Sequence, residues 1–139
     1  MIRVAIANQQ RFVRLDRPRL RRIVREVITG EGITDAEISL AFVDDRTIHR
    51  INKRFLDHDE PTDVISFPLS APKARILSGE LIVSAETAKR IATQLGGAAE
   101  SELTLYVVHG LLHLCGYDDC SAPKRRAMRK RERHYLARI

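Results

Sequence analysis

Two histidines lie four residues apart in the segment V-V-H-G-L-L-H-L-C-G-Y-D-D-C, which spans residues 107–120. In a helix of about 3.6 residues per turn, His109 and His113 fall on one face, one turn apart. Gly116 then ends the helix, because glycine adopts the left-handed conformation that commonly follows a last turn. The residues after it can fold back towards the histidines. Two imidazoles, a third ligand and an open fourth position are the plan of a catalytic metal site.

Three residues after Gly116 compete for the place of third ligand. We expect Asp119 to be this ligand, followed by Cys120 and then Asp118. A carboxylate oxygen binds zinc and is also hard enough for magnesium or manganese. Cys115 lies in the last helical turn, two residues after His113, and points to a different face.

Gly110 occupies the position at which the zinc protease signature carries its glutamate general base. Without that proton acceptor, peptide hydrolysis by this route is disfavoured. The histidine pair alone is also compatible with one core histidine and one solvated histidine. The prediction that both bind a metal therefore depends on the surrounding residues.

Alternation, capping residues and glycines predict the elements that must position these residues. The predicted strands are Arg3–Ala7, Glu37–Val43, Asp63–Phe67 and Gly79–Val83. The predicted helices run from Asp16 to Thr29, from Asp44 or Asp45 to Phe55, from Ser84 to Leu95, from Glu100 to Cys115, and onward from Pro123. No repeat or linker divides residues 1–139. We expect a single α+β domain with a small four-stranded mixed sheet, about five helices, and the metal site on a central helix.

The composition points to a soluble globular protein. Hydrophobic residues make up 44% of the 139 residues, and no apolar run approaches the roughly 20 residues of a membrane span. The first residues lack the apolar core and cleavage pattern of a secretory signal. The two cysteines, Cys115 and Cys120, are too few for a disulfide framework. We therefore expect a cytoplasmic protein with no membrane partner.

The charge is strongly basic and is gathered at both ends of the chain. There are 24 Lys and Arg residues against 18 Asp and Glu. One cluster comprises Arg11, Arg14, Arg17, Arg19, Arg21, Arg22 and Arg25, and the other comprises Lys124, Arg125, Arg126, Arg129, Lys130, Arg131 and Arg133. Arginine forks bind phosphate in bidentate fashion, so nucleic acid is the first candidate partner, with two solvated helix faces as the alternative. Three Tyr and four Phe indicate little base stacking and weak sequence readout.

Three motifs together resemble one known family. H-G-L-L-H-L-C-G-Y-D-D, residues 109–119, resembles the H-G-x-L-H-L-x-G-Y-D-H motif of the YbeY family of bacterial ribosomal-RNA maturation endoribonucleases. Residues 52–68, N-K-R-F-L-D-H-D-E-P-T-D-V-I-S-F-P, resemble the family segment that ends in P-T-D-V-L-S-F-P. Residues 79–84, G-E-L-I-V-S, are similar to its G-D-I-x-I-S. The likeness therefore spans most of the chain.

This resemblance implies a metal-dependent endoribonuclease specific for single-stranded RNA, acting in small-subunit ribosomal RNA maturation and ribosome quality control. It also implies one divalent metal ion, with zinc favoured. The implied partners are ribosomal RNA, ribosomal particles and a ribosome-associated GTPase.

The metal motif departs from the family pattern at its last ligand. The first two family histidines fall on His109 and His113, and the third falls on Asp119. A carboxylate in place of a neutral imidazole lowers the formal charge of the site by one and favours harder metals. Sites with two histidines and one carboxylate still support hydrolysis.

The upstream motif departs as well. Leu56 stands where the family carries an arginine thought to act on the RNA phosphate. Arg54 and His58 are the nearby candidates for this catalytic task, although each is also compatible with a solvated surface position. Glu80 stands where the family has aspartate and is a candidate for orienting a ligand histidine or a water, or a simple edge-strand charge.

Two other functional classes are compatible with these residues. One is a ribosome-assembly factor in which the metal is structural and the departures have abolished cleavage. The other is a metallohydrolase of small molecules or peptides. The basic ends argue against the second, and Gly110 argues against its protease form.

Overall fold

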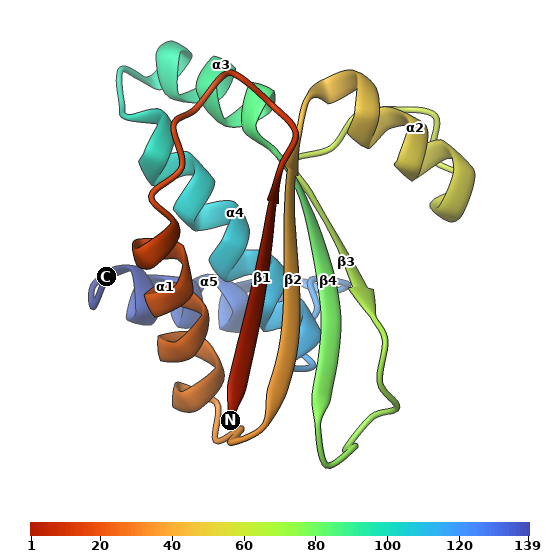
Figure 1. Ribbon diagram of the computed structural model, residues 1–139, viewed down its shortest axis with the longest axis vertical. Helices are drawn as coiled ribbons and strands as arrows, with labels where there is room; N and C mark the ends of the chain where they lie inside the picture. The colour runs from red at the N-terminus through yellow and green to blue at the C-terminus, as the bar shows by residue number, and fades with distance from the viewer.

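The computed structural model describes residues 1–139 as five helices and four strands (Figure 1). The strands are β1 Ile2–Asn8, β2 Ala36–Val43, β3 Val64–Pro68 and β4 Leu77–Ser84. The helices are α1 Arg17–Gly30, α2 Asp45–Leu56, α3 Ala85–Leu95, α4 Ala99–Leu114 and α5 Ala122–Leu136. The predicted α+β class, with a four-stranded mixed sheet and five helices, is confirmed. None of the helices combines the length and the apolar composition needed to cross a membrane.

Short polar side chains begin four of the five helices. Asp16, Asp44, Ser84 and Ser121 each accept a hydrogen bond from a backbone N–H in the first turn of the helix that follows. Such a bond satisfies one of the N–H groups that a helix start leaves without a partner. The helix starts therefore follow from residues that are adjacent in the sequence.

The sheet has the strand order β1-β2-β4-β3. β1, β2 and β4 are parallel, whereas β3 runs antiparallel to β4 and forms one edge. The two parallel connections contain helices, as such crossovers usually do. Because β3 is an edge strand, it pairs with β4 on one side and has no strand partner on the other. α4 lies next to it.

The two faces of the sheet are covered unequally. In Figure 1, α1, α4 and α5 lie on one face, and α2 lies on the other at one end of the sheet. A core of 22 buried residues covers the first face. A second cluster lies between α2 and the other face and comprises Val43, Ile48, Ile65 and Ile82. On the rest of the second face, side chains such as Arg3 and Glu37 are exposed. Chemistry that depends on α4 must therefore occur on the first face or at the β3 edge.

A polar network holds α2 against α3. Asp45, in the first turn of α2, accepts hydrogen bonds from Ser84 Oγ at 2.6 Å, Thr87 Oγ1 at 2.5 Å and Arg90 Nη1 at 2.5 Å. Burial raises the pKa of Asp45, but these three donors outweigh it and the pKa is lowered overall. The network fixes the start of α2, the helix that leads into residues 57–63.

Candidate metal centre

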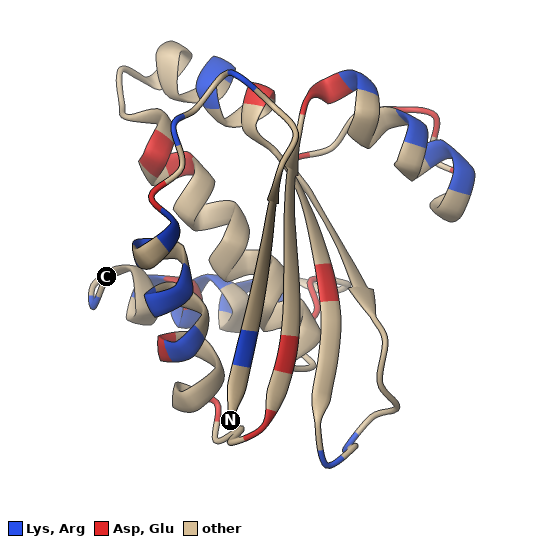
Figure 2. Ribbon diagram, in the orientation of Figure 1, with Lys and Arg blue, Asp and Glu red and all other residues tan.

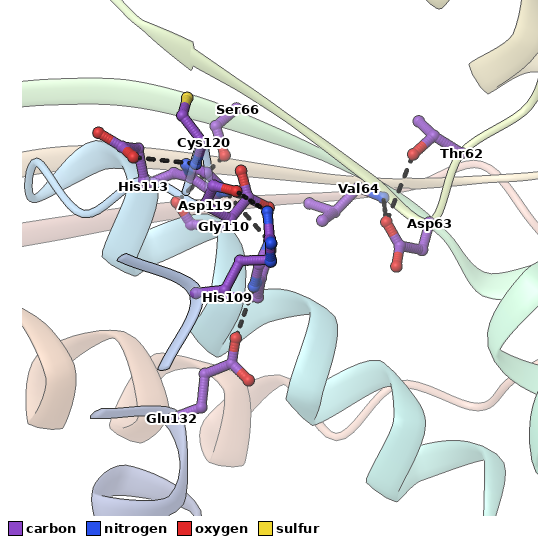
Figure 3. A network of polar contacts seen from close by, with 12 residues as sticks. Thr62, Asp63, Val64, Ser66, His109, Gly110, His113, Asp119, Cys120 and Glu132 are labelled. Carbon is purple, nitrogen blue, oxygen red and sulfur yellow. Dashed lines mark hydrogen bonds and ion pairs between the residues drawn. The ribbon is translucent and has the colours of Figure 1, made fainter. Parts of the chain in front are cut away.

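A cleft of about 620 Å³ lies between the end of α4, the edge strand β3 and the loop that follows α2. Its lining includes His58, Asp63, Ser66, His109, His113 and Asp119. These residues come from four separate segments of the chain, and Figure 3 labels all of them except His58. The cleft therefore joins the metal motif to the upstream motif.

Three atoms that could bind a metal ion lie close together in this cleft. His109 Nε2 and His113 Nε2 are 3.1 Å apart, and Asp119 Oδ2 lies 4.0 Å and 3.9 Å from them. Metal bonds of about 2.0–2.2 Å in a tetrahedral site place ligand atoms about 3.3–3.6 Å from one another. His109, His113 and Asp119 are thus close enough to hold a single ion after small side-chain adjustments.

Helix geometry and one glycine produce this arrangement. His109 and His113 lie one turn apart on α4, each with a little over a quarter of its side chain exposed. Gly116 then takes a φ of +106°, a region that glycine enters at little cost. The chain turns back there and brings Asp119, which is half exposed, to the histidines.

Glu132 lies behind the first histidine. Its Oε1 is 2.6 Å from His109 Nδ1, and its side chain is only 12% exposed. A carboxylate on Nδ1 holds the proton there and leaves Nε2 free to bind a metal. The hydrogen bond with Glu132 raises the pKa of His109, while burial and the neighbouring His109 lower the pKa of His113.

Gly110 faces the sheet and not the cleft. A Cβ at this position would lie 2.9 Å from Leu81 Cδ2 and 3.1 Å from Val64 Cγ2. Ser66 Oγ also donates a hydrogen bond to the Gly110 carbonyl at 3.1 Å. The close packing of α4 on β3 and β4 therefore leaves no room for a glutamate base after His109.

Of the residues predicted from the upstream motif, the structure brings His58 to the cleft but not Arg54. His58 lines the cleft together with Leu56. Arg54 is exposed near the end of α2, and its guanidinium carbon lies 5.4 Å from the centroid of the Phe55 ring. His58 is therefore the better placed of the two candidates.

Glu80 lies on the wrong face of the sheet for the role expected of it. Its neighbours Gly79 and Leu81 pack against α4, so alternation along β4 directs Glu80 to the opposite face. Glu80 does not line the cleft. The carboxylate that contacts a ligand histidine is Glu132, the only acidic residue in the basic helix α5. This isolated acid was the one signal in the sequence that could have identified it.

The other two candidates for the third ligand lie outside the cluster. The side chains whose possible ligand atoms all lie within 4.8 Å of one another are those of His109, His113 and Asp119. Asp118 accepts hydrogen bonds from the Cys120 backbone N–H at 3.1 Å and from Lys124 Nζ at 3.3 Å. This geometry favours Asp119.

Comparison with known proteins gives one consistent family. A family model described as Endoribonuclease YbeY matches residues 5–139. The chain is 36% identical over 146 residues to the Endoribonuclease YbeY of Pelotomaculum thermopropionicum, covering 98% of this chain and 96% of that protein. It is 36% identical over 142 residues to the one from Geobacter metallireducens, covering 98% and 95%. A solution structure of a Thermotoga maritima protein matches with a TM-score of 0.69 and 27% identity, covering 98% of this chain and 87% of that one.

Proposed function

Because this chain belongs to the YbeY endoribonuclease family, we propose that it is a metal-dependent endoribonuclease that cleaves single-stranded RNA. We place its action in small-subunit ribosomal RNA maturation and ribosome quality control in the cytoplasm, with ribosomal particles and a ribosome-associated GTPase as partners. The observation that supports metal dependence most directly is the cluster of His109, His113 and Asp119 in the cleft.

The donor set suits one divalent ion. His109, His113 and Asp119 would hold it, with zinc favoured by the two imidazoles and harder metals admitted by the carboxylate. When bound, the ion supplies a Lewis acid that stabilises negative charge on a phosphodiester oxygen. Glu132 keeps His109 Nε2 directed into the cleft. His58, also on the cleft wall, is placed to hydrogen-bond a phosphate or leaving oxygen.

The helices that carry the two basic clusters, α1 and α5, come together near their C-terminal ends. Arg19 and Arg22 of α1 line the same small cavity as Arg138, just after α5. At the other end of α5, Arg125 Nη1 donates to the Asp119 carbonyl at 3.2 Å. Figure 2 shows basic residues along both α1 and α5. Exposed basic side chains therefore lie on α5 between the cleft and α1, and we infer that they bind the phosphates of an RNA strand.

Metal removal tests this function. The purified protein should cleave a single-stranded RNA oligonucleotide, lose that activity after exhaustive chelation, and regain it when Zn²⁺ or Mn²⁺ is added back. A duplex of the same sequence should remain intact. Cleavage at an undiminished rate in protein shown by elemental analysis to be metal-free would reject the metal nuclease. Binding to ribosomal particles without any cleavage would favour the assembly-factor alternative.

The basic surface gives a second prediction. Arg129 is exposed on α5, one turn before Glu132, and Arg129→Ala should weaken binding of a single-stranded oligonucleotide several-fold at low salt. Loss of one phosphate contact should also reduce the slope of log affinity against log salt by about 0.7. Arg3→Ala is the matched control, because Ile2 and Val4 pack against the main core and alternation along β1 directs the exposed Arg3 to the opposite face. Equal affinities and slopes for both variants, measured by fluorescence anisotropy, would place the RNA elsewhere.

A further inference from the structure

One buried carboxylate lies outside the cleft and contacts α5, the helix that carries Glu132. Glu31, directly after α1, has a side chain that is only 9% exposed. Its Oε2 accepts a hydrogen bond from Arg131 Nε at 2.7 Å and another from the Tyr135 hydroxyl. Both donors belong to α5, so Glu31 joins the end of α1 to α5 across 100 residues of sequence.

The surrounding packing leaves α5 little freedom at this point. Tyr135 is buried, and a Cβ on Gly30 would lie 2.5 Å from its hydroxyl oxygen. Arg131 Nη2 donates to the Gly30 carbonyl at 3.3 Å, and its guanidinium lies 4.9 Å from the centroid of the Tyr135 ring. Glu31 therefore lies at the centre of a closely packed joint between α1 and α5.

One path leads from this joint to the candidate ligands. Arg131, which donates to Glu31, immediately precedes Glu132 in α5, and Glu132 holds His109. Glu31 therefore fixes the segment of α5 from which Glu132 reaches the histidine.

We propose that Glu31 is a positioning residue for the metal centre, which sets the placement of Glu132, and through it of His109, by way of Arg131. The inference rests on the proposed metal site. It assigns a role at this site to a residue that touches neither the ligand atoms nor the cleft lining.

A purely structural role is the competing explanation, and the chain offers a matched control for it. Asp45 is also a largely buried carboxylate with three side-chain donors, one of them arginine. It joins α2 to α3 and contacts none of the elements that carry ligands. Asp45→Asn should lower the melting temperature and leave metal affinity unchanged, whereas Glu31→Gln should change both.

The experiment measures Zn²⁺ affinity by competition with a chelating dye, and the visible spectrum of the Co²⁺-substituted protein, well below the melting temperatures. We expect Glu31→Gln to weaken Zn²⁺ binding about tenfold, at the lower end of the range for partners of metal ligands, and to shift the Co²⁺ bands. In a Glu132→Gln background the same change should cost less, because the two residues act on one histidine. Tyr135→Phe keeps the ring and removes one of the donors to Glu31, so it should weaken Zn²⁺ binding less but in the same direction. This variant provides the test if Glu31→Gln does not fold.

The outcomes separate this inference from the proposed function. If the wild-type protein binds Zn²⁺, and Glu31→Gln and Tyr135→Phe bind it equally well with unchanged Co²⁺ spectra, Glu31 is not a positioning residue and the metal site stands. If the wild-type protein binds neither metal, the proposed site fails and the inference fails with it.

Discussion

Replacement of His113 with alanine should abolish stoichiometric metal binding and reduce the rate of RNA cleavage by about a thousandfold or more. The change removes His113 Nε2, one of the three proposed ligand atoms, which lies 3.1 Å from His109 Nε2. A bound metal contributes several kcal/mol of charge stabilisation, and each 1.36 kcal/mol corresponds to a factor of ten in rate. Alanine is the strongest helix former, so α4 should remain folded.

Elemental analysis and single-turnover cleavage of an RNA oligonucleotide measure the two effects. His134→Ala is the matched control, since His134 lies on the last turns of α5 and does not line the cleft. It should keep its metal and its cleavage rate. Wild-type metal content in His113→Ala would remove this histidine from the site, and full cleavage without metal would remove the metal from the reaction.

Replacement of Asp119 should have the second largest effect and should identify the third ligand. Changes to the partners of metal ligands commonly cost 10- to 100-fold in affinity, so loss of a ligand should cost at least about a hundredfold. Asp119→Ala should therefore bind Zn²⁺ at least that much more weakly, with little change in stability because the side chain is half exposed. Asp119→His should bind Zn²⁺ well and discriminate more strongly against Mn²⁺ and Mg²⁺, because imidazole is a softer donor than carboxylate.

Competition titrations with Zn²⁺ and Mn²⁺ compare these variants directly. Asp118→Ala serves as the neighbouring control, since Asp118 bonds Lys124 and the backbone of Cys120. Its metal content should equal that of the wild type. If Asp119→Ala retains its metal and either Asp118→Ala or Cys120→Ala loses it, the third ligand is Asp118 or Cys120 and not Asp119.

Much of the local structure could be predicted from short-range signals. The helix expected at Glu100–Cys115 is observed at Ala99–Leu114, and Gly116 has the positive φ expected of it. Asp16 and Ser84 cap the helices that they were expected to begin. Capping, alternation and the freedom of glycine act over a few residues, so no knowledge of the fold is needed to apply them.

The role expected of Glu80 shows what local sequence patterns cannot predict. Alternation predicts that Glu80 and its neighbours in β4 point to opposite faces, but not which face α4 covers. The structure places Gly79 and Leu81 against α4, and this excludes Glu80 from the histidines. The same packing explains why residue 110 is glycine, since Leu81 occupies the space that a side chain would need.

The sequence by itself determined that His109 and His113 lie side by side one helical turn apart, and that a chain reversal follows them, because both depend on geometry within a single turn. Only the tertiary structure decided that Glu132 holds His109 from 23 residues away, that Glu31 anchors α5, and that the cleft includes His58. Those contacts exist because a 22-residue core packs α1 and α4 against one face of the sheet and α5 against α4. Packing of that kind depends on the shapes of side chains distant in sequence, which no local pattern specifies.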